Sequence, residues 1–165
     1  MTIGRNSIRR GGFTALEALI AAAILAFLTA TVSGALMAGR AQSRMARDMV
    51  AASMLGQSLM EEVMRLPVKD PQGALTIGPE AGEVRSTFNA VDDYHGYSDG
   101  LTTITDLAGN GYPAAYQGFV RQVSVSPTTY TPSGWGLTVS AMLVTVTVSS
   151  SDGRELIKIQ RTACN

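Results

Sequence analysis

The sequence predicts an α+β fold in which a long N-terminal helix packs its second half on a small antiparallel β-sheet. Three patterns support this: an uncharged apolar run from Ala18 to Gly39, a two-sided helical pattern from Arg40 to Leu66, and alternating apolar and polar residues after Phe119. The chain has 165 residues, 45% of them hydrophobic, which fits one modest domain. We expect a leader over 1–12, a helix over 13–66 and a head of antiparallel strands and loops over 67–165.

The first part of the predicted helix is long enough to cross a membrane. A bilayer core of about 30 Å requires about 20 apolar residues in a helix, and no charge interrupts the run from Ala18 to Gly39. Arg9 and Arg10 precede this run, and basic flanking residues stay in the cytoplasm. We therefore expect one membrane span over 13–39, with Arg40 and everything after it outside the cytoplasm.

Beyond Arg40 one face of the helix, over 40–66, is expected to be apolar and to rest on the head. The residues at three-and-four spacing on this face are Met45, Met49, Ala52, Gly56, Leu59, Val63 and Leu66. The residues expected largely on the wet faces are Arg44, Arg47, Asp48, Gln57, Glu61 and Glu62. Pro67 ends the helix because proline lacks an amide donor and disfavours helix at the preceding residue.

The head is expected to contain a β-hairpin near its C-terminal end. The Asp152-Gly153 pair lies between alternating segments at 142–149 and 154–162, and this turn pair favours a hairpin. Phe119, Val123 and Val125 alternate with polar residues and predict a further strand. Short strands are also predicted at Leu75–Ile77 and Val84–Phe88.

The boundary between leader and apolar run carries a specific pattern. Gly11-Gly12 is followed by Phe13-Thr14-Ala15-Leu16-Glu17. This pattern resembles the prepilin peptidase site of type IV pilins and type II secretion pseudopilins, where cleavage follows glycine, the new N-terminal phenylalanine is N-methylated, and the fifth mature residue is glutamate. The family order is closer to Phe-Thr-Leu-Ile-Glu-Leu, so Ala15, Leu16 and Ala18 depart from it. The resemblance implies cleavage between Gly12 and Phe13, methylation of Phe13, and an assembly role for Glu17.

The same resemblance implies a pilin-like fold, with the hydrophobic half of the helix protruding, and a structural role. The protein would be a minor pilin or pseudopilin of a type IV pilus or type II secretion pseudopilus, held first in the inner membrane. Its partners would be other pilin subunits through the N-terminal helix, prepilin peptidase, the inner-membrane assembly platform and membrane lipid. More loosely, Glu61-Glu62, Leu66-Pro67 and the stretch 91–100 resemble minor pilins of the mannose-sensitive haemagglutinin pilus system.

Glu17 is the most informative single residue of this pattern. A carboxylate costs about 3 kcal/mol at the middle of a membrane and less near its edge, so a partner is expected. In the family that partner is the amine of Phe13 on a neighbouring subunit. In the first turn of a helix, Glu17 would also gain about 0.3 to 1 kcal/mol from the helix dipole. The two roles are compatible.

The stretch 91–100 is dense in polar and aromatic residues. Asp92, Asp93 and Asp99 offer oxygens to calcium, but their spacing does not match the Asp-x-Asp-x-Asp-Gly loop. A loop held by side-chain to backbone hydrogen bonds is the preferred interpretation, and we expect no resident metal.

Composition argues against several other classes of function. The 13 basic and 13 acidic side chains give zero formal charge, and no basic patch indicates nucleic acid. Cys164 is the only cysteine, so it cannot form a disulfide within the chain; it is a bystander or forms an intermolecular disulfide. His95 is the only histidine and has no nucleophile at a recognisable spacing, and no phosphate loop or dinucleotide motif occurs. We expect neither an enzyme nor a cofactor.

Two alternatives remain. One is a membrane-anchored extracytoplasmic binding domain with an uncleaved N-terminal anchor, although a plain anchor has no use for Glu17. The other is a secreted domain released near 38–41, although a secretory signal has an apolar stretch of only about 7 to 15 residues. The mature N-terminus distinguishes these classes: methylated Phe13, Met1, or a residue near Arg40.

Overall fold

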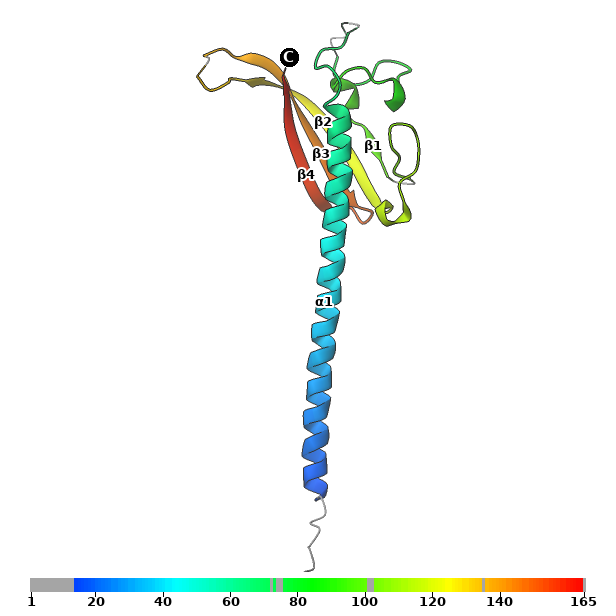
Figure 1. Ribbon diagram of the computed structural model, residues 1–165, viewed down its shortest axis with the longest axis vertical. Coiled ribbons are helices and arrows are strands. Elements are labelled where there is room, and N and C mark those ends of the chain that lie inside the picture. Colours follow the sequence, from blue (N-terminus) through cyan, green and yellow to red (C-terminus); the bar gives the residue numbers. More distant parts are fainter. Residues whose placement is uncertain (1–13, 72, 74–75, 101–102, 135, 165) are drawn as a thin grey trace, which may run out of the picture. The chain divides into compact units, whose positions relative to one another are not determined.

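The computed structural model describes residues 14–71, 73, 76–100, 103–134 and 136–164. It contains one long helix followed by four strands, in the order α1 (Ala15–Val63), η1 (Arg85–Thr87), η2 (Asp92–Tyr94), β1 (Ser98–Asp99), η3 (Ala114–Tyr116), β2 (Phe119–Tyr130), β3 (Val139–Ser150) and β4 (Glu155–Cys164). The strands form one antiparallel sheet in the order β1-β2-β3-β4 (Figure 1). The predicted α+β class is confirmed. Contacts divide the chain into two units, residues 1–44 and 45–165, which are described in turn.

The first unit exposes its apolar side chains. Every described residue up to Arg44 is exposed, and Leu19, Phe27 and Leu36 expose 70%, 68% and 58% of their surfaces. An 18-residue window of α1 has a mean hydropathy of 2.2 and none of it is buried. By length and composition this helix is able to span a membrane. So much contiguous apolar surface requires a cover of lipid or protein.

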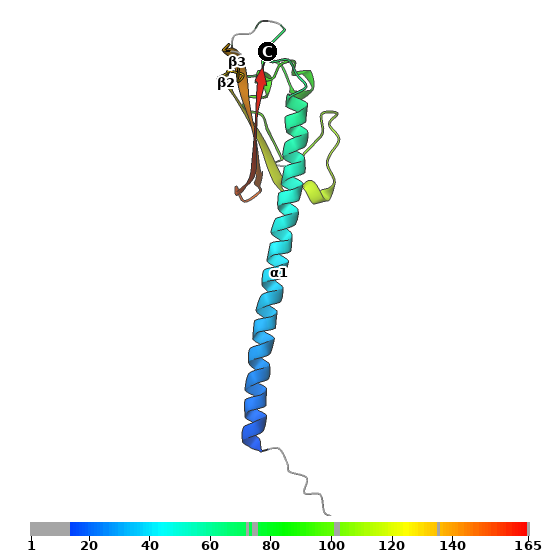
Figure 2. The same ribbon diagram turned by 60° about the vertical axis from the view of Figure 1, so that its left-hand side comes forward.

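In the second unit, the core lies between the C-terminal half of α1 and the sheet (Figures 1 and 2). Most of the buried apolar residues come from α1, β2 and β3: Ala52, Leu55, Leu59, Met60, Val63, Phe119, Val123, Val125, Val144, Val146 and Val148. Gly56 permits close packing here, since a Cβ on it would lie 3.1 Å from Ile159 Cδ1 and 3.2 Å from Val148 Cγ2. The predicted packing of helix on sheet is thus confirmed.

The buried face of α1 differs from the predicted stripe at both edges. Met45 and Met49 were expected on it, but each is 46% exposed, because burial of the helix begins only near Ala52. Leu55 and Met60 were not expected there and are fully buried. The buried arc is wider than one stripe because residues of the connecting region join the same core as the sheet, namely Val91, Tyr94 and Ile104.

The regular helix ends at Val63, before the predicted end at Leu66. Arg65 N donates to Glu62 O (3.3 Å), and Leu66 N donates to Val63 O (3.2 Å), which is the spacing of a tighter 3₁₀ turn. Pro67 explains this change, since its ring disfavours the α conformation at the residue before it.

The predicted C-terminal hairpin is confirmed as β3 and β4, with Val146 opposite Ile159. Gly153 has a φ of 86°, and its N–H donates to Ser150 O at 2.9 Å. Asp152 Oδ1 accepts a bond from Arg154 N at 3.1 Å. The Asp-Gly pair therefore closes this turn as its sequence indicates.

The two short strands predicted in the connecting region are not found. Val84–Phe88 is wrong as a strand, because Thr87 N donates to Val84 O at 2.7 Å and closes the 3₁₀ turn η1. Of Leu75–Ile77, Leu75 lies outside the described residues, and Thr76 and Ile77 form a bend. Alternation over five residues is too short to distinguish a strand from a turn held by a side chain.

Gly100 lies where two backbone segments approach closely. Its φ is 104°, and a Cβ would lie 2.1 Å from the carbonyl oxygen of Phe119. We expect Gly100→Ala to destabilise the protein by more than about 3 kcal/mol, since positive-φ strain of about 1 to 3 kcal/mol combines with a backbone clash. Gly109→Ala is the matched control, with a φ of 84° and no atom within 4 Å of the added Cβ. Urea unfolding of the full chain measures both; equal losses would contradict the clash.

Candidate functional sites

Glu17 is exposed and lies in the first turn of α1. Thr14 N and Thr14 Oγ1 each donate to Glu17 Oε2 at 3.3 Å, and Glu17 N donates to Thr14 Oγ1 at 3.3 Å. This reciprocal arrangement is a capping box, which satisfies two amide groups at the helix start. The expected position of Glu17 in the first helical turn is confirmed. The capping box itself was missed, although the Thr-x-x-Glu spacing before an apolar run is its sequence signature.

Gly12 and Phe13 lie outside the described residues. Cleavage between them and methylation of Phe13 stay predictions from the sequence.

A buried ionic network joins α1, the connecting region and the sheet in the second unit. Arg85 Nε and Nη2 donate to Glu62 Oε1 and Oε2, both at 2.7 Å. Arg85 Nη1 lies 3.5 Å from Asp99 Oδ2. Arg121 Nε donates to Asp99 Oδ1 at 2.9 Å, and Arg121 Nη2 bonds Asp99 Oδ2. We call Glu62, Arg85, Asp99 and Arg121 the ionic network.

Two tyrosines donate hydrogen bonds to the carboxylates of the ionic network. Tyr94 Oη donates to Glu62 Oε1 at 2.5 Å, and Tyr97 Oη donates to Asp99 Oδ2 at 3.0 Å. Burial alone would raise the pKa of Glu62, but hydrogen bonds from Arg85 and Tyr94 outweigh it and lower that pKa. Burial, with the charge of Asp99, raises the pKa of Tyr97 to about 12. Glu62 therefore stays ionised beside Arg85, and both carboxylates of the network are held by arginines, which suits them to stabilise the fold.

Sequence reasoning missed this network for two reasons. Glu62 was expected on the wet face of the helix, but its side chain is only 13% exposed because Arg85 from the connecting region covers it. The second reason is that Arg121, a charged residue that was not considered for the core, is fully buried. Its position shares the inward parity of Phe119 and Val123 on β2, which is the signal that could have found it.

The three aspartates considered for calcium have separate partners. Asp99 belongs to the ionic network, and Asp93 Oδ2 accepts bonds from Asn89 N (2.8 Å) and Ala90 N (2.9 Å). Asp92 is buried beside Asp93 in η2. The predicted loop with side-chain to backbone hydrogen bonds is present. His95 also serves it, because Nδ1 accepts a bond from Val125 N at 3.1 Å.

A different acidic cluster was not predicted. Carboxylate oxygens of Glu80, Glu83 and Asp93 lie within 4.8 Å of one another, and we call these residues the acidic cluster. Glu80 N donates to Glu83 Oε2 and Glu83 N donates to Glu80 O, both at 3.0 Å, which closes a turn. The hydrogen bond with Glu83, together with burial, raises the pKa of Glu80 to about 7. These three acids are 13 positions apart at most and none follows a familiar ligand spacing.

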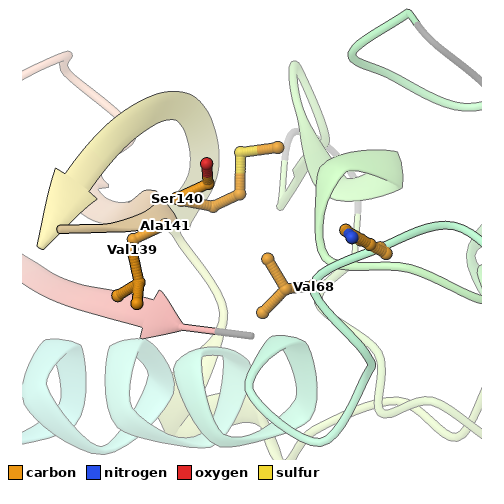
Figure 3. Close-up of a pocket in the computed structure, with 6 residues that line it drawn as sticks. Val68, Val139, Ser140 and Ala141 are labelled. Atoms are coloured by element: carbon orange, nitrogen blue, oxygen red, sulfur yellow. The ribbon is translucent and has the colours of Figure 1, made fainter. Parts of the chain in front are cut away.

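A pocket of about 380 Å³ opens beside the start of β3 (Figure 3). Its described lining residues are Val68, Lys69, Val139, Ser140, Ala141 and Met142. This lining is mainly apolar and contains an amine and a hydroxyl but no carboxylate, so it offers no acid–base pair.

Comparison with known proteins gave no match. No family model matches the chain, and no curated protein or solved structure matches it either.

Proposed function

We propose that this protein is a type IV pilin-like subunit, a minor pilin or pseudopilin that is processed between Gly12 and Phe13 and assembles through α1. Before assembly its apolar helix lies in the inner membrane, and the head lies outside the cytoplasm. Its partners are prepilin peptidase, the assembly platform and other subunits.

The observation that carries this proposal is an exposed carboxylate at the start of an exposed apolar helix. Glu17 interacts with Thr14, a neutral residue, so its charge has no opposite charge among its observed hydrogen-bond partners. Immediately after it, the uncharged run needs a cover of lipid or protein. A carboxylate in such surroundings is stabilised by a cation. Cleavage after Gly12 creates one, the ammonium of Phe13, close in sequence to Glu17 on every subunit.

Packing of identical helices would supply both a cover for the apolar surface of α1 and a cation for Glu17. Neighbouring subunits cover the apolar side chains of one another, such as Leu19, Phe27 and Leu36, which are all more than half exposed in the single chain. A salt bridge from Glu17 to the Phe13 amine of a neighbour then fixes the axial offset between helices, because the attraction is strong only at short range in a low dielectric. An uncleaved anchor offers no amine at this position.

The processing step is tested by the mass of the mature N-terminus. The full gene is expressed with and without prepilin peptidase, and the membrane fraction is analysed by mass spectrometry. With the peptidase we expect a chain beginning at Phe13 and bearing one added methyl group. Gly12→Val should leave the leader attached, because a bulky residue at the scissile bond obstructs the peptidase. Gly4→Val, the same change farther from the bond, should be processed normally. A mature chain that begins at Met1 or near Arg40 would refute the proposal.

A further inference from the structure

We propose that the acidic cluster, Glu80, Glu83 and Asp93, binds a calcium ion in the head, with Asn89 as a fourth oxygen ligand. This site lies wholly within the second unit and does not depend on filament assembly.

Buried oxygens without donors point to a cation. Apart from a proton that Glu80 and Glu83 would share, no hydrogen-bond donor among the described residues reaches Glu80 Oε1, Glu80 Oε2 or Asp93 Oδ1, and these three atoms are buried. Asn89 Oδ1 is also buried without a donor. Asp93 as a whole is 1% exposed. A buried acceptor without a partner costs about 1 to 3 kcal/mol, and more when it is charged. One bound cation would account for the oxygens of Glu80 and Asp93 together, because both residues belong to the acidic cluster.

The surrounding backbone already holds the ligands in place. The bonds from Asn89 N and Ala90 N fix one oxygen of Asp93 and leave the other available. The turn between Glu80 and Glu83 brings their carboxylates together. Asn89 Nδ2 lies 3.2 Å from Glu83 Oε1, so a half-turn of the planar amide places Oδ1 at the cluster.

The local charge also favours a divalent cation. Asp92, which is 6% exposed, adds a further buried acid next to the cluster, and its Oδ1 also lacks a donor among the described residues. A positive ion would offset the negative charge that these acids gather in one place.

The ligand chemistry selects calcium. All the ligand atoms of the cluster are oxygens, whereas zinc prefers nitrogen and sulfur ligands. Neither His95 nor Cys164 belongs to the cluster. Oxygens bound to one calcium at about 2.3 to 2.6 Å lie at most about 5 Å apart, and the cluster's oxygens lie within 4.8 Å of one another. Magnesium demands a near-ideal octahedron, which an irregular set from one turn and one fixed carboxylate does not provide.

A bound ion would tie two parts of the connecting region together. Val91 N donates to Pro67 O at 3.0 Å, so the segment that carries Asn89 and Asp93 is attached to the chain just beyond the end of α1. The ion would attach the Glu80–Glu83 turn to that segment. Calcium should therefore stabilise the head against unfolding.

The test uses the full chain in detergent micelles, stripped with EDTA and dialysed, and titrated with calcium chloride by calorimetry. We expect one saturable site with a Kd of about 10⁻⁴ to 10⁻³ M, typical of extracellular calcium modules. At ten times the Kd, Tm should rise by about 4 to 8 °C. Magnesium chloride at the same concentration should raise it much less. Absence of saturable binding, or an equal effect of magnesium, would overturn the assignment.

Two variants locate the site. Glu80→Gln and Glu83→Gln remove a charge with little change of shape, and each should weaken calcium binding at least about tenfold, as expected for loss of a charged ligand. Glu155→Gln removes an exposed acid at the start of β4 and is the matched control. It should bind calcium like the parent chain. Circular dichroism confirms that each variant is folded. Unchanged calcium affinity in both cluster variants would place the ion elsewhere and refute the proposal.

Discussion

Glu17→Gln should be processed normally but incorporated into filaments at a level lower by a factor of about 30 or more. Loss of one partner from a buried charge pair costs about 2 to 5 kcal/mol, and the lower value corresponds to this factor. Glutamine keeps the local structure, because its side-chain oxygen also accepts the Thr14 N–H in a capping box. The variant therefore removes the charge and retains the helix start. Immunoblotting of sheared filaments against the membrane fraction measures incorporation.

Thr14→Val is the complementary control for the Glu17 variant. It removes the hydroxyl that caps Glu17 N and lowers helix stability by about 1 kcal/mol, but it leaves the carboxylate charged. Incorporation should stay close to that of the parent chain. If Thr14→Val reduced incorporation as strongly as Glu17→Gln, the role of this motif would be local capping. If Glu17→Gln entered filaments normally, the proposed pairing with Phe13 would be wrong.

Arg121→Met should destabilise the head by about 3 to 5 kcal/mol, the range for removing one member of a buried ion pair. Arg121 is fully buried, and its guanidinium holds both oxygens of Asp99 and also donates to Thr105 O at 2.9 Å. Methionine fills similar space without the charge. Arg85 stays 3.5 Å from Asp99 and offsets part of the loss, so we expect a value near the lower limit.

Urea unfolding of the full chain, followed by circular dichroism, measures this loss. The matched control is Arg154→Met at an exposed arginine, which should change stability by no more than about 0.5 kcal/mol. In a double-mutant cycle with Asp99→Asn, the two losses of unfolding free energy should be strongly non-additive. The second change removes the carboxylate that the first left poorly paired. Additive losses would show that Arg121 acts through packing alone.

Local periodicity predicted the elements whose structure is decided locally. The uncharged run, the helical stripe from Ala52 to Val63 and the Asp152-Gly153 turn each depend on residues within a few positions of one another. Met45 and Met49 were wrongly expected to be buried, because the sequence shows which face of the helix is apolar but not where the head begins to cover it.

The ionic network could not be predicted in the same way. Glu62, Arg85 and Arg121 are far apart in sequence, and each is an ordinary charged residue in its own neighbourhood. Their pairing depends on how the connecting region folds back on the sheet, and that region lacks a regular pattern. The acidic cluster is similar, since Asp93 meets Glu80 and Glu83 through hydrogen bonds from the backbone and side chain of Asn89.

The ionic network also bears on where the head is able to fold. Extracytoplasmic domains with long irregular segments often rely on disulfides, but this chain has one cysteine and cannot form an internal one. Here, charge pairs inside the protein fasten the irregular segment between α1 and β2. Unlike disulfides, these ion pairs do not depend on the redox state of the surroundings. The head therefore needs no oxidase to reach its native structure, and it should stay folded when thiol reductants are added.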